Sequence, residues 1–230
     1  MIEKTIKIAI IDNSINPSVY KPVEHWRQFI NHQADAFTAR KREFPDLSEG
    51  YTHMIITGSE ASIMEREPWV YLEVEVVREA VERGLSILGS CYGHQLLALS
   101  LFGPQRVARC RKPEVGWLSI PFEPNPLVPD GGRMDIFTSH FDEVVNLPED
   151  CRVFASTPGC SVQAFQLGDY PVWGIQPHPE ISIAEGRRFF EAVIATGIRN
   201  KDLFQTALES TPRDSGLIQP LVANFLCASA

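Results

Sequence analysis

Residues 86–102 constrain the fold of this chain more than any other stretch. They begin with a short apolar run typical of a buried strand and end in an apolar stretch typical of a helix. Between them, Gly89-Ser90-Cys91-Tyr92-Gly93 must turn the chain sharply, and glycine suits places where strand and helix backbones approach closely. The spacing is that of a nucleophile elbow with cysteine in place of serine, and the N-terminus of the following helix favours a thiolate. Since a buried cysteine between unrelated glycines would give the same spacing, the interpretation depends on partners elsewhere in the chain.

The first hundred residues alternate between strand and helix signals. Apolar runs at 6–12, 34–39 and 52–57 predict strands, and the valines at positions 70, 74, 77 and 81 predict one apolar stripe of a helix. This alternation indicates a doubly wound, mainly parallel sheet with helices on both faces. Asp12, Gly58 and Cys91 each follow a predicted strand, so we expect them at the carboxyl edge of the sheet, where ligands bind in such folds.

The alternation of strand and helix signals stops at about residue 105. Short strand-like runs are separated by turns rich in proline and glycine, and they lie at 105–110, 116–122, 134–138, 152–157, 162–167 and 171–176. We expect antiparallel additions to the same sheet. A capping box at Ser182–Glu185 begins a helix, and two further helices are predicted within 200–210 and 215–227. The predicted organisation is one domain over 1–197, with a helical tail over 198–230 packed on it.

Composition excludes several classes of protein. The 230 residues are 44% hydrophobic and carry a formal net charge of −8, which argues against a partner that is nucleic acid or an anionic membrane. A charged start followed by a short strand predicts that there is no signal peptide. The five cysteines show no Cys-x-x-Cys spacing, so we expect reduced thiols in a cytoplasmic protein, with no metal site and no cofactor.

A second stretch supplies the partners that Cys91 needs. A predicted strand ends at Pro177-His178-Pro179-Glu180. The two prolines stiffen the backbone around His178, which suits a general base that must keep its orientation. Glu180 can hydrogen-bond the imidazole, fix its tautomer and stabilise the imidazolium. The alternative is a lone histidine beside a turn. This alternative is disfavoured because a cysteine elbow is predicted on the same sheet edge.

Taken together, the two motifs resemble those of the class I glutamine amidotransferases. That family has a Gly-x-Cys-x-Gly-x-Gln elbow and a late His-Pro-Glu, present here as residues 89–95 and 178–180, and the resemblance covers about residues 5–195. It implies a flavodoxin-like fold of the amidotransferase type. It also implies a catalytic triad of Cys91, His178 and Glu180.

The resemblance extends to further positions, one at a time. It implies an oxyanion hole built from the turn at Gly58 and Ser59 and from the N–H of Tyr92, although the turn departs from the commoner Gly-Gly-Pro. It implies substrate binding by Gln95, by backbone groups of Ser139 and Phe141 and, as an alternative to a purely structural role, by His140. The stretch 114–117 is also similar to the family.

Two enzyme functions and one binding function follow from the resemblance. The first is a free-standing, GMP-synthase-like amidotransferase subunit, which releases ammonia and glutamate from glutamine through a cysteine thioester and feeds a separate synthetase. The second is a γ-glutamyl peptidase or hydrolase that acts on glutathione-like compounds and needs no partner. The third, a non-catalytic glutamine-binding module, is disfavoured because all three triad residues are present.

Overall fold

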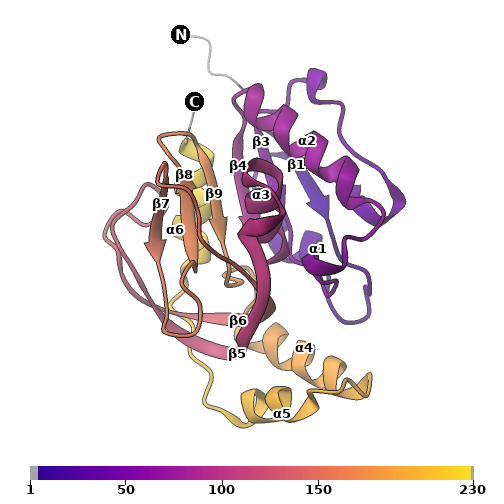
Figure 1. The fold of residues 1–230 in the computed structure, drawn as a ribbon, viewed down its shortest axis with the longest axis vertical. Coiled ribbons are helices and arrows are strands. Elements are labelled where there is room, and N and C mark those ends of the chain that lie inside the picture. Colours follow the sequence, from indigo (N-terminus) through magenta and orange to yellow (C-terminus); the bar gives the residue numbers. More distant parts are fainter. Residues whose placement is uncertain (1–4, 229–230) are drawn as a thin grey trace.

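The computed structural model describes residues 5–228, so the first four residues, which bear on the expected lack of a signal peptide, lie outside it. Nine strands within the described range form one sheet, in the order β2-β1-β3-β4-β9-β8-β7-β5-β6 (Figure 1). The first five in this order run parallel to one another: β2 (Gln33–Thr38), β1 (Lys7–Asp12), β3 (His53–Ile56), β4 (Ser86–Ser90) and β9 (Val172–Ile175). The other four are added antiparallel: β8 (Ala164–Leu167), β7 (Cys151–Ala155), β5 (Val107–Phe122) and β6 (Gly132–Val144). The predicted fold class is confirmed.

The central strands are apolar on both faces because helices cover both sides of the sheet. Successive residues of a strand point to opposite faces. In β1, Ala9 and Ile11 belong to one buried cluster, and Ile8 and Ile10 belong to another. Such strands are expected to be nearly continuous apolar runs, as they are here. By contrast, β2 lies at the edge of the sheet and is half exposed.

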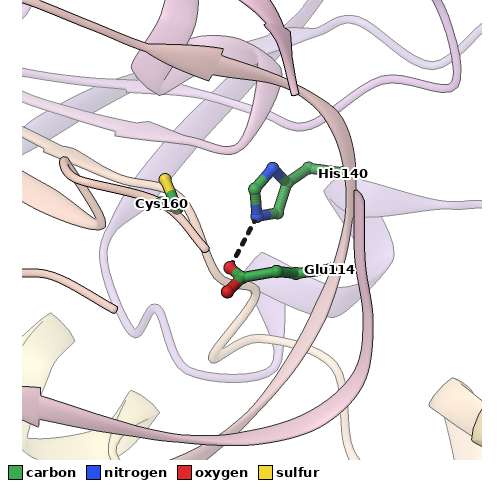
Figure 2. A group of neighbouring side chains, drawn as sticks. All are labelled: Glu114, His140 and Cys160. Atoms are coloured by element: carbon green, nitrogen blue, oxygen red, sulfur yellow. Dashed lines mark hydrogen bonds and ion pairs between the residues drawn. The ribbon is translucent and has the colours of Figure 1, made fainter. Parts of the chain in front are cut away.

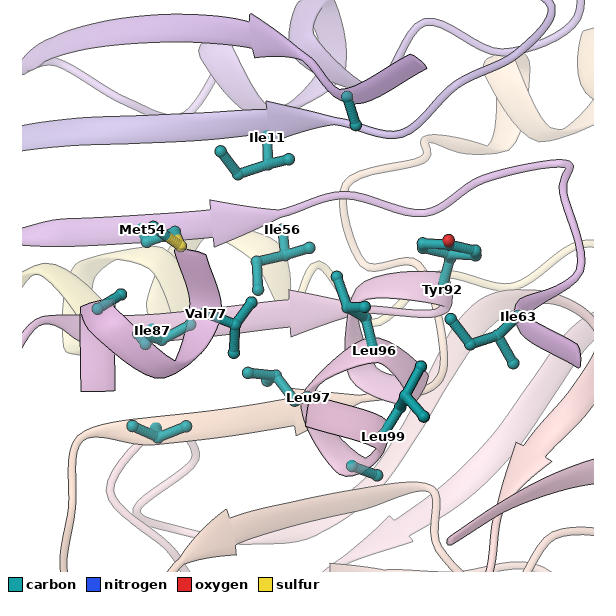
Figure 3. Packing of buried hydrophobic residues seen from close by; sticks show 14 of the residues in the cluster. Ile11, Met54, Ile56, Ile63, Val77, Ile87, Tyr92, Leu96, Leu97 and Leu99 are labelled. Carbon is teal, nitrogen blue, oxygen red and sulfur yellow. The ribbon is translucent and has the colours of Figure 1, made fainter. Parts of the chain in front are cut away.

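One face of the sheet is covered by α2 (Val70–Glu82) and α3 (Tyr92–Phe102). Figure 3 shows side chains of β1 and β3 facing those of both helices, among them Ile11, Ile56, Val77, Leu96 and Leu97. The opposite face is covered by α1 (Pro22–Arg27) and, from the end of the chain, by α6 (Ile218–Cys227). A third cluster joins α4 (Ile183–Ala195) and α5 (Lys201–Glu209) to β5 and β6.

Two predictions of local structure are wrong. The runs predicted at 105–110 and 116–122 are one strand, β5, whose pairing with β6 shifts register between Arg109 and Glu114. This irregularity contains Pro113, which has no N–H to donate to the neighbouring strand. The sequence therefore predicts two strands where the structure has one bent strand. In α2, Glu73 and Ala80 are buried, while Val74 and Val81 are only partly buried, so the buried stripe is rotated from the predicted one.

The two helices predicted near the end of the chain are present as α5 and α6, and the capping box at Ser182 and Glu185 begins α4. No helix within residues 5–228 is both long and apolar enough to cross a membrane.

Candidate active site

Cys91 stands at a sharp turn between β4 and α3. Its backbone has φ 50° and ψ −104°, a conformation that costs a non-glycine residue free energy and is typical of a nucleophile elbow. The flanking glycines are required by close backbone approach. A Cβ at Gly89 would lie 2.5 Å from the carbonyl oxygen of Gly93, and a Cβ at Gly93 would collide with the carbonyl of Ile56.

The sheet order brings His178 to the same edge as Cys91. Strands β4 and β9 are parallel neighbours, and Ser90 is paired with Ile175 at their carboxyl ends. The N–H of Cys91 donates to the carbonyl of Ile175 at 2.8 Å, which ties the elbow to β9. Three residues further on, the N–H of His178 donates to the carbonyl of Phe137 at 2.8 Å.

His178 and Glu180 form a buried pair that includes a third residue. His178 Nδ1 lies 2.8 Å from Glu180 Oε1, and both side chains are almost fully buried. The Tyr20 hydroxyl donates to the same Oε1 at 2.7 Å and lies 3.3 Å from His178 Nδ1. Sequence reasoning misses Tyr20 because this residue stands in a loop and belongs to no motif. Only the packing of that loop against residues 178–180 makes it part of the site.

The electrostatics of this group favour an ion pair. Burial alone would lower the pKa of His178, but the neighbouring Cys91 and the hydrogen-bonded Glu180 raise it to about 10. Burial opposes ionisation of Glu180, yet the adjacent His178 and the hydrogen bond from Tyr20 hold the pKa of this carboxyl below its usual range. Burial and Glu180 raise the pKa of the Tyr20 hydroxyl well above its usual value, so the hydroxyl remains a donor.

The three residues expected at the oxyanion hole lie near Cys91 or His178. Gly58 lies against the histidine, and a Cβ there would be 2.6 Å from His178 Cε1. Ser59 and Tyr92 line the same cavity as Cys91. Tyr92 is the first residue of α3, so its N–H has no acceptor within the helix and is free for a ligand.

A cavity of about 320 Å³ opens over Cys91, and it includes every predicted substrate-binding residue: Gln95, Ser139, His140 and Phe141. The Cys91 Sγ lies 3.9 Å from the carbonyl oxygen of Ser139. One wall is apolar and comes from the C-terminal part of the chain, with Phe189, Val193, Ile198 and Phe204. No sequence motif indicates this wall.

Gln95 is held in place by the protein itself. Its Nε2 donates to the carbonyl of Asp142 at 2.8 Å and to Gln176 Oε1 at 3.1 Å. The amide nitrogen is therefore engaged, and Oε1 is the part of this side chain that can accept a hydrogen bond from a ligand.

His140 has protein partners at both ring nitrogens. Nδ1 lies 3.0 Å from the carbonyl oxygen of Asp142, and Nε2 lies 3.1 Å from Glu114 Oε2. His140 lines the cavity together with its neighbours Ser139 and Phe141, but both of its ring nitrogens are engaged by protein groups.

Comparison with known proteins assigns the family. The sequence model of the class I glutamine amidotransferases matches residues 14–194. The chain belongs to this family. γ-Glutamyl peptidase 4 of Arabidopsis thaliana is 27% identical in an alignment of 207 positions that covers 84% of this chain and 81% of the peptidase. The matched range covers every residue of the site described above except Ile198 and Phe204 of the C-terminal tail.

The glutamine-hydrolysing subunit of GMP synthase from Methanothermobacter thermautotrophicus is 40% identical over 108 residues, which are 46% of this chain and 58% of that subunit. Among solved structures, a glutamine amidotransferase from Thermotoga maritima superposes with a TM-score of 0.74, covering 97% of this chain and 99% of that one, at 21% identity. At that identity the likeness concerns the fold alone. The class I amidotransferase relatives thus include both glutamine-hydrolysing synthase subunits and peptidases.

Proposed function

We propose that this chain hydrolyses γ-glutamyl amides through a thioester on Cys91. The observation that carries the proposal is the position of Cys91, at a strained elbow beside the buried His178–Glu180 pair and at the floor of a cavity. A thiolate, a general acid–base and an orienting carboxylate are the groups that covalent acyl transfer needs.

In the proposed reaction, Cys91 Sγ attacks the γ-carbonyl carbon and the carbonyl oxygen becomes an oxyanion. The N–H groups of Tyr92 and Ser59 are the proposed donors to this oxyanion, and a donor of this kind is worth about 2.7–4 kcal/mol in the transition state. His178 gives its proton to the departing nitrogen as the C–N bond breaks, which leaves a γ-glutamyl thioester. Water, deprotonated by His178, then attacks the thioester, the C–S bond breaks and glutamate leaves.

With glutamine as substrate, the amine released is ammonia. Gln95, Ser139 and Phe141 are proposed to hold the α-amino and α-carboxylate groups. A separate synthetase subunit would receive the ammonia, and the similarity to the glutamine-hydrolysing subunit of GMP synthase supports this partner. We also place the protein in the cytoplasm, because its five cysteines are free thiols, which suits a reducing compartment.

A γ-glutamyl peptidase is the second candidate, and one specific observation favours it. Ammonia needs no apolar contact, yet the cavity over Cys91 has an apolar wall with Phe189, Ile198 and Phe204. The match to γ-glutamyl peptidase 4 also spans most of both chains, whereas the match to the GMP synthase subunit is confined to 108 residues.

Glutamate release tests the proposal. The purified protein is incubated with glutamine and, separately, with γ-glutamyl peptides, and glutamate is measured over time. Cys91→Ala is expected to abolish release from every substrate, while Cys151→Ala, which removes a thiol outside the cavity, leaves the rate unchanged. Binding of glutamine without turnover would favour the non-catalytic module, and full activity of Cys91→Ala would reject the nucleophile assignment.

A further inference from the structure

A second group of metal-ligating side chains lies outside the proposed triad. Glu114 on β5, His140 on β6 and Cys160 in the loop before β8 each place one ligand atom within 4.8 Å of the others (Figure 2). His140 and Cys160 are almost fully buried. The proposed reaction uses neither Glu114 nor Cys160.

The orientation of His140 is that of a metal ligand. Nδ1 lies 3.0 Å from the carbonyl of Asp142, which can only accept a hydrogen bond, and 3.3 Å from Cys110 Sγ. These two contacts engage Nδ1, and Nε2 is the nitrogen available for a ligand bond. Metal-binding histidines usually donate their other N–H to a carbonyl or carboxylate in this way, which fixes the tautomer and aims the ring. Nε2 points at Glu114, as Figure 2 shows.

The spacing of the ligand atoms suits a small tetrahedral ion. His140 Nε2 and Glu114 Oε2 are 3.1 Å apart. Two such ligands bound to zinc at about 2.0–2.2 Å in tetrahedral geometry would be separated by roughly 3.3–3.6 Å, so the two atoms would move apart by a few tenths of an ångström. The ion would take the place of the proton between these two atoms, and only a small movement of Cys160 would complete a sulfur–nitrogen–oxygen set.

The other oxygen of Glu114 is already fixed. The Thr157 hydroxyl donates to Glu114 Oε1 at 2.8 Å, which leaves Oε2 to face the histidine. Gln163 Nε2 also donates to Oε2, at 2.5 Å. Hydrogen bonds of this kind orient the carboxylate that ligates an ion.

Solvent can reach the group from a second cavity, of about 630 Å³. Glu114, Glu143 and Gly159 are among the residues that line it, and Cys91 is not. Glu114 is the one candidate ligand that lines this cavity, so an ion can approach the group from the Glu114 side.

We propose that Glu114, His140 and Cys160 form a zinc site. Zinc is the ion expected from this mixture of thiolate, imidazole and carboxylate ligands. The proposal departs from the sequence expectation of no metal, which rested on cysteine spacing, because the three ligands come from distant parts of the chain. An ion here would also fix the strand segment in which Ser139 and Phe141 line the substrate cavity.

Cobalt binding tests the site directly. The measurements use the Cys91→Ala variant of all 230 residues, because Cys91, His178 and Glu180 could themselves bind a metal. Titration with Co²⁺ is expected to give one equivalent bound, with the near-ultraviolet charge-transfer band of a thiolate–cobalt bond. Addition of Zn²⁺ should displace the cobalt and raise the melting temperature, since an ion that binds only the folded state stabilises it.

Matched variants identify the ligands. Adding Cys160→Ser is expected to abolish the charge-transfer band and weaken binding by at least about 10-fold, because serine is a poor ligand for these ions. Adding Cys151→Ser is expected to leave both unchanged. If Cys160→Ser lowers the melting temperature without metal, Glu114→Gln provides the same comparison of affinity. Absence of a thiolate–cobalt band in Cys91→Ala, or its persistence after Cys160→Ser, would overturn the proposal and leave the group as a hydrogen-bonded network.

Discussion

The Tyr20 hydroxyl donates a 2.7 Å hydrogen bond to Glu180 Oε1, the oxygen that also lies 2.8 Å from His178 Nδ1. Tyr20 touches no expected reacting atom, so we regard it as a positioning residue for the pair. Tyr20→Phe keeps the ring that packs edge-on against His178 but removes the hydrogen bond. A hydrogen bond to a charged group contributes about 1.5–3 kcal/mol.

We expect Tyr20→Phe to lower kcat by about 10-fold, which corresponds to about 1.4 kcal/mol in the barrier. KM should be unchanged, because the hydroxyl acts on the Glu180 side of the imidazole and not on the substrate. Steady-state kinetics with glutamine or a γ-glutamyl peptide separate the two constants. A rise in KM at constant kcat would show that Tyr20 acts on substrate binding instead.

The Glu180→Gln variant tests the orienting carboxylate through the pH profile. The pKa of His178 is raised to about 10, so activity should persist to alkaline pH and fall as the imidazolium loses the proton needed by the departing amine. Glutamine at position 180 removes one of the charges that raise this pKa, so the alkaline limb should move to lower pH. We also expect kcat to fall by about 100-fold or more, as for other triads that lose the orienting carboxylate. An unchanged alkaline limb would contradict the role of Glu180.

The raised pKa of His178 also predicts how the stability of the fold depends on pH. The folded-state pKa of His178 lies above its ordinary value of 6.5. The stabilisation from His178 is therefore fully present below about pH 6.5 and is lost as the pH rises through about 10. Glu180→Gln should make this loss begin at lower pH, which denaturant unfolding across the range would detect.

The buried carboxyl of Glu73 predicts a second dependence of stability on pH. Burial raises the pKa of this carboxyl to about 8, and the nearby polar side chains of Asn13 and Tyr92 only partly offset the shift. The folded state therefore holds a proton that the unfolded state releases above its ordinary pKa of 4.5, so stability is lost as pH rises from about 4.5 to about 8. Glu73→Gln has no charge to bury, and it should raise the melting temperature at pH 8 by at least ~3 °C and by less at pH 5. Equal effects at both values would contradict this account.

Ile198 tests the apolar wall of the cavity. It is 37% exposed, so changing it should cost little stability. Ile198→Asp places a charge in the wall and should raise KM for a γ-glutamyl peptide with an apolar second residue by about 10-fold, the usual scale of such contacts. KM for glutamine should not change, and Ile198→Leu serves as the apolar control. A parallel increase for glutamine would mean that Ile198 contributes to the γ-glutamyl site itself.

The residues that could be predicted from the sequence are those whose roles are encoded locally. Cys91 is identified by the glycines beside it, and His178 by the prolines beside it. Because parallel strands share a carboxyl edge, their proximity could be predicted without knowing the order of the strands. That order, with β4 next to β9, could not be predicted, since most of the strands between them in sequence pair elsewhere in the sheet.

Residues whose surroundings come from distant segments could not be found in this way. Tyr20 belongs to a loop with no periodic pattern, and its contact with Glu180 spans 160 positions. Glu73 interrupts an apolar helix and would ordinarily be assigned to the solvent face, but the helix is rotated so that this carboxyl is 1% exposed. The group at Glu114, His140 and Cys160 combines two strands and a loop, and no spacing in the sequence indicates it.

Phe225 tests whether the tail over 198–230 folds as part of the same domain, as predicted. Its side chain is 0% exposed, and its ring packs edge-on against Trp173 of β9 and His53 of β3. We expect Phe225→Ala to lower the free energy of unfolding by about 3–5 kcal/mol, the range for large-to-small changes in a core. Denaturant unfolding should show one transition, with loss of glutamate release at the same midpoint. Leu203→Ala, at a site that is 40% exposed, is the control and should change stability by about 0.5 kcal/mol or less. The contrary result would be two separate transitions for Phe225→Ala, with activity lost only in the second. The tail would then be a folding unit of its own, and α6 would not be needed to complete the sheet that carries Cys91 and His178.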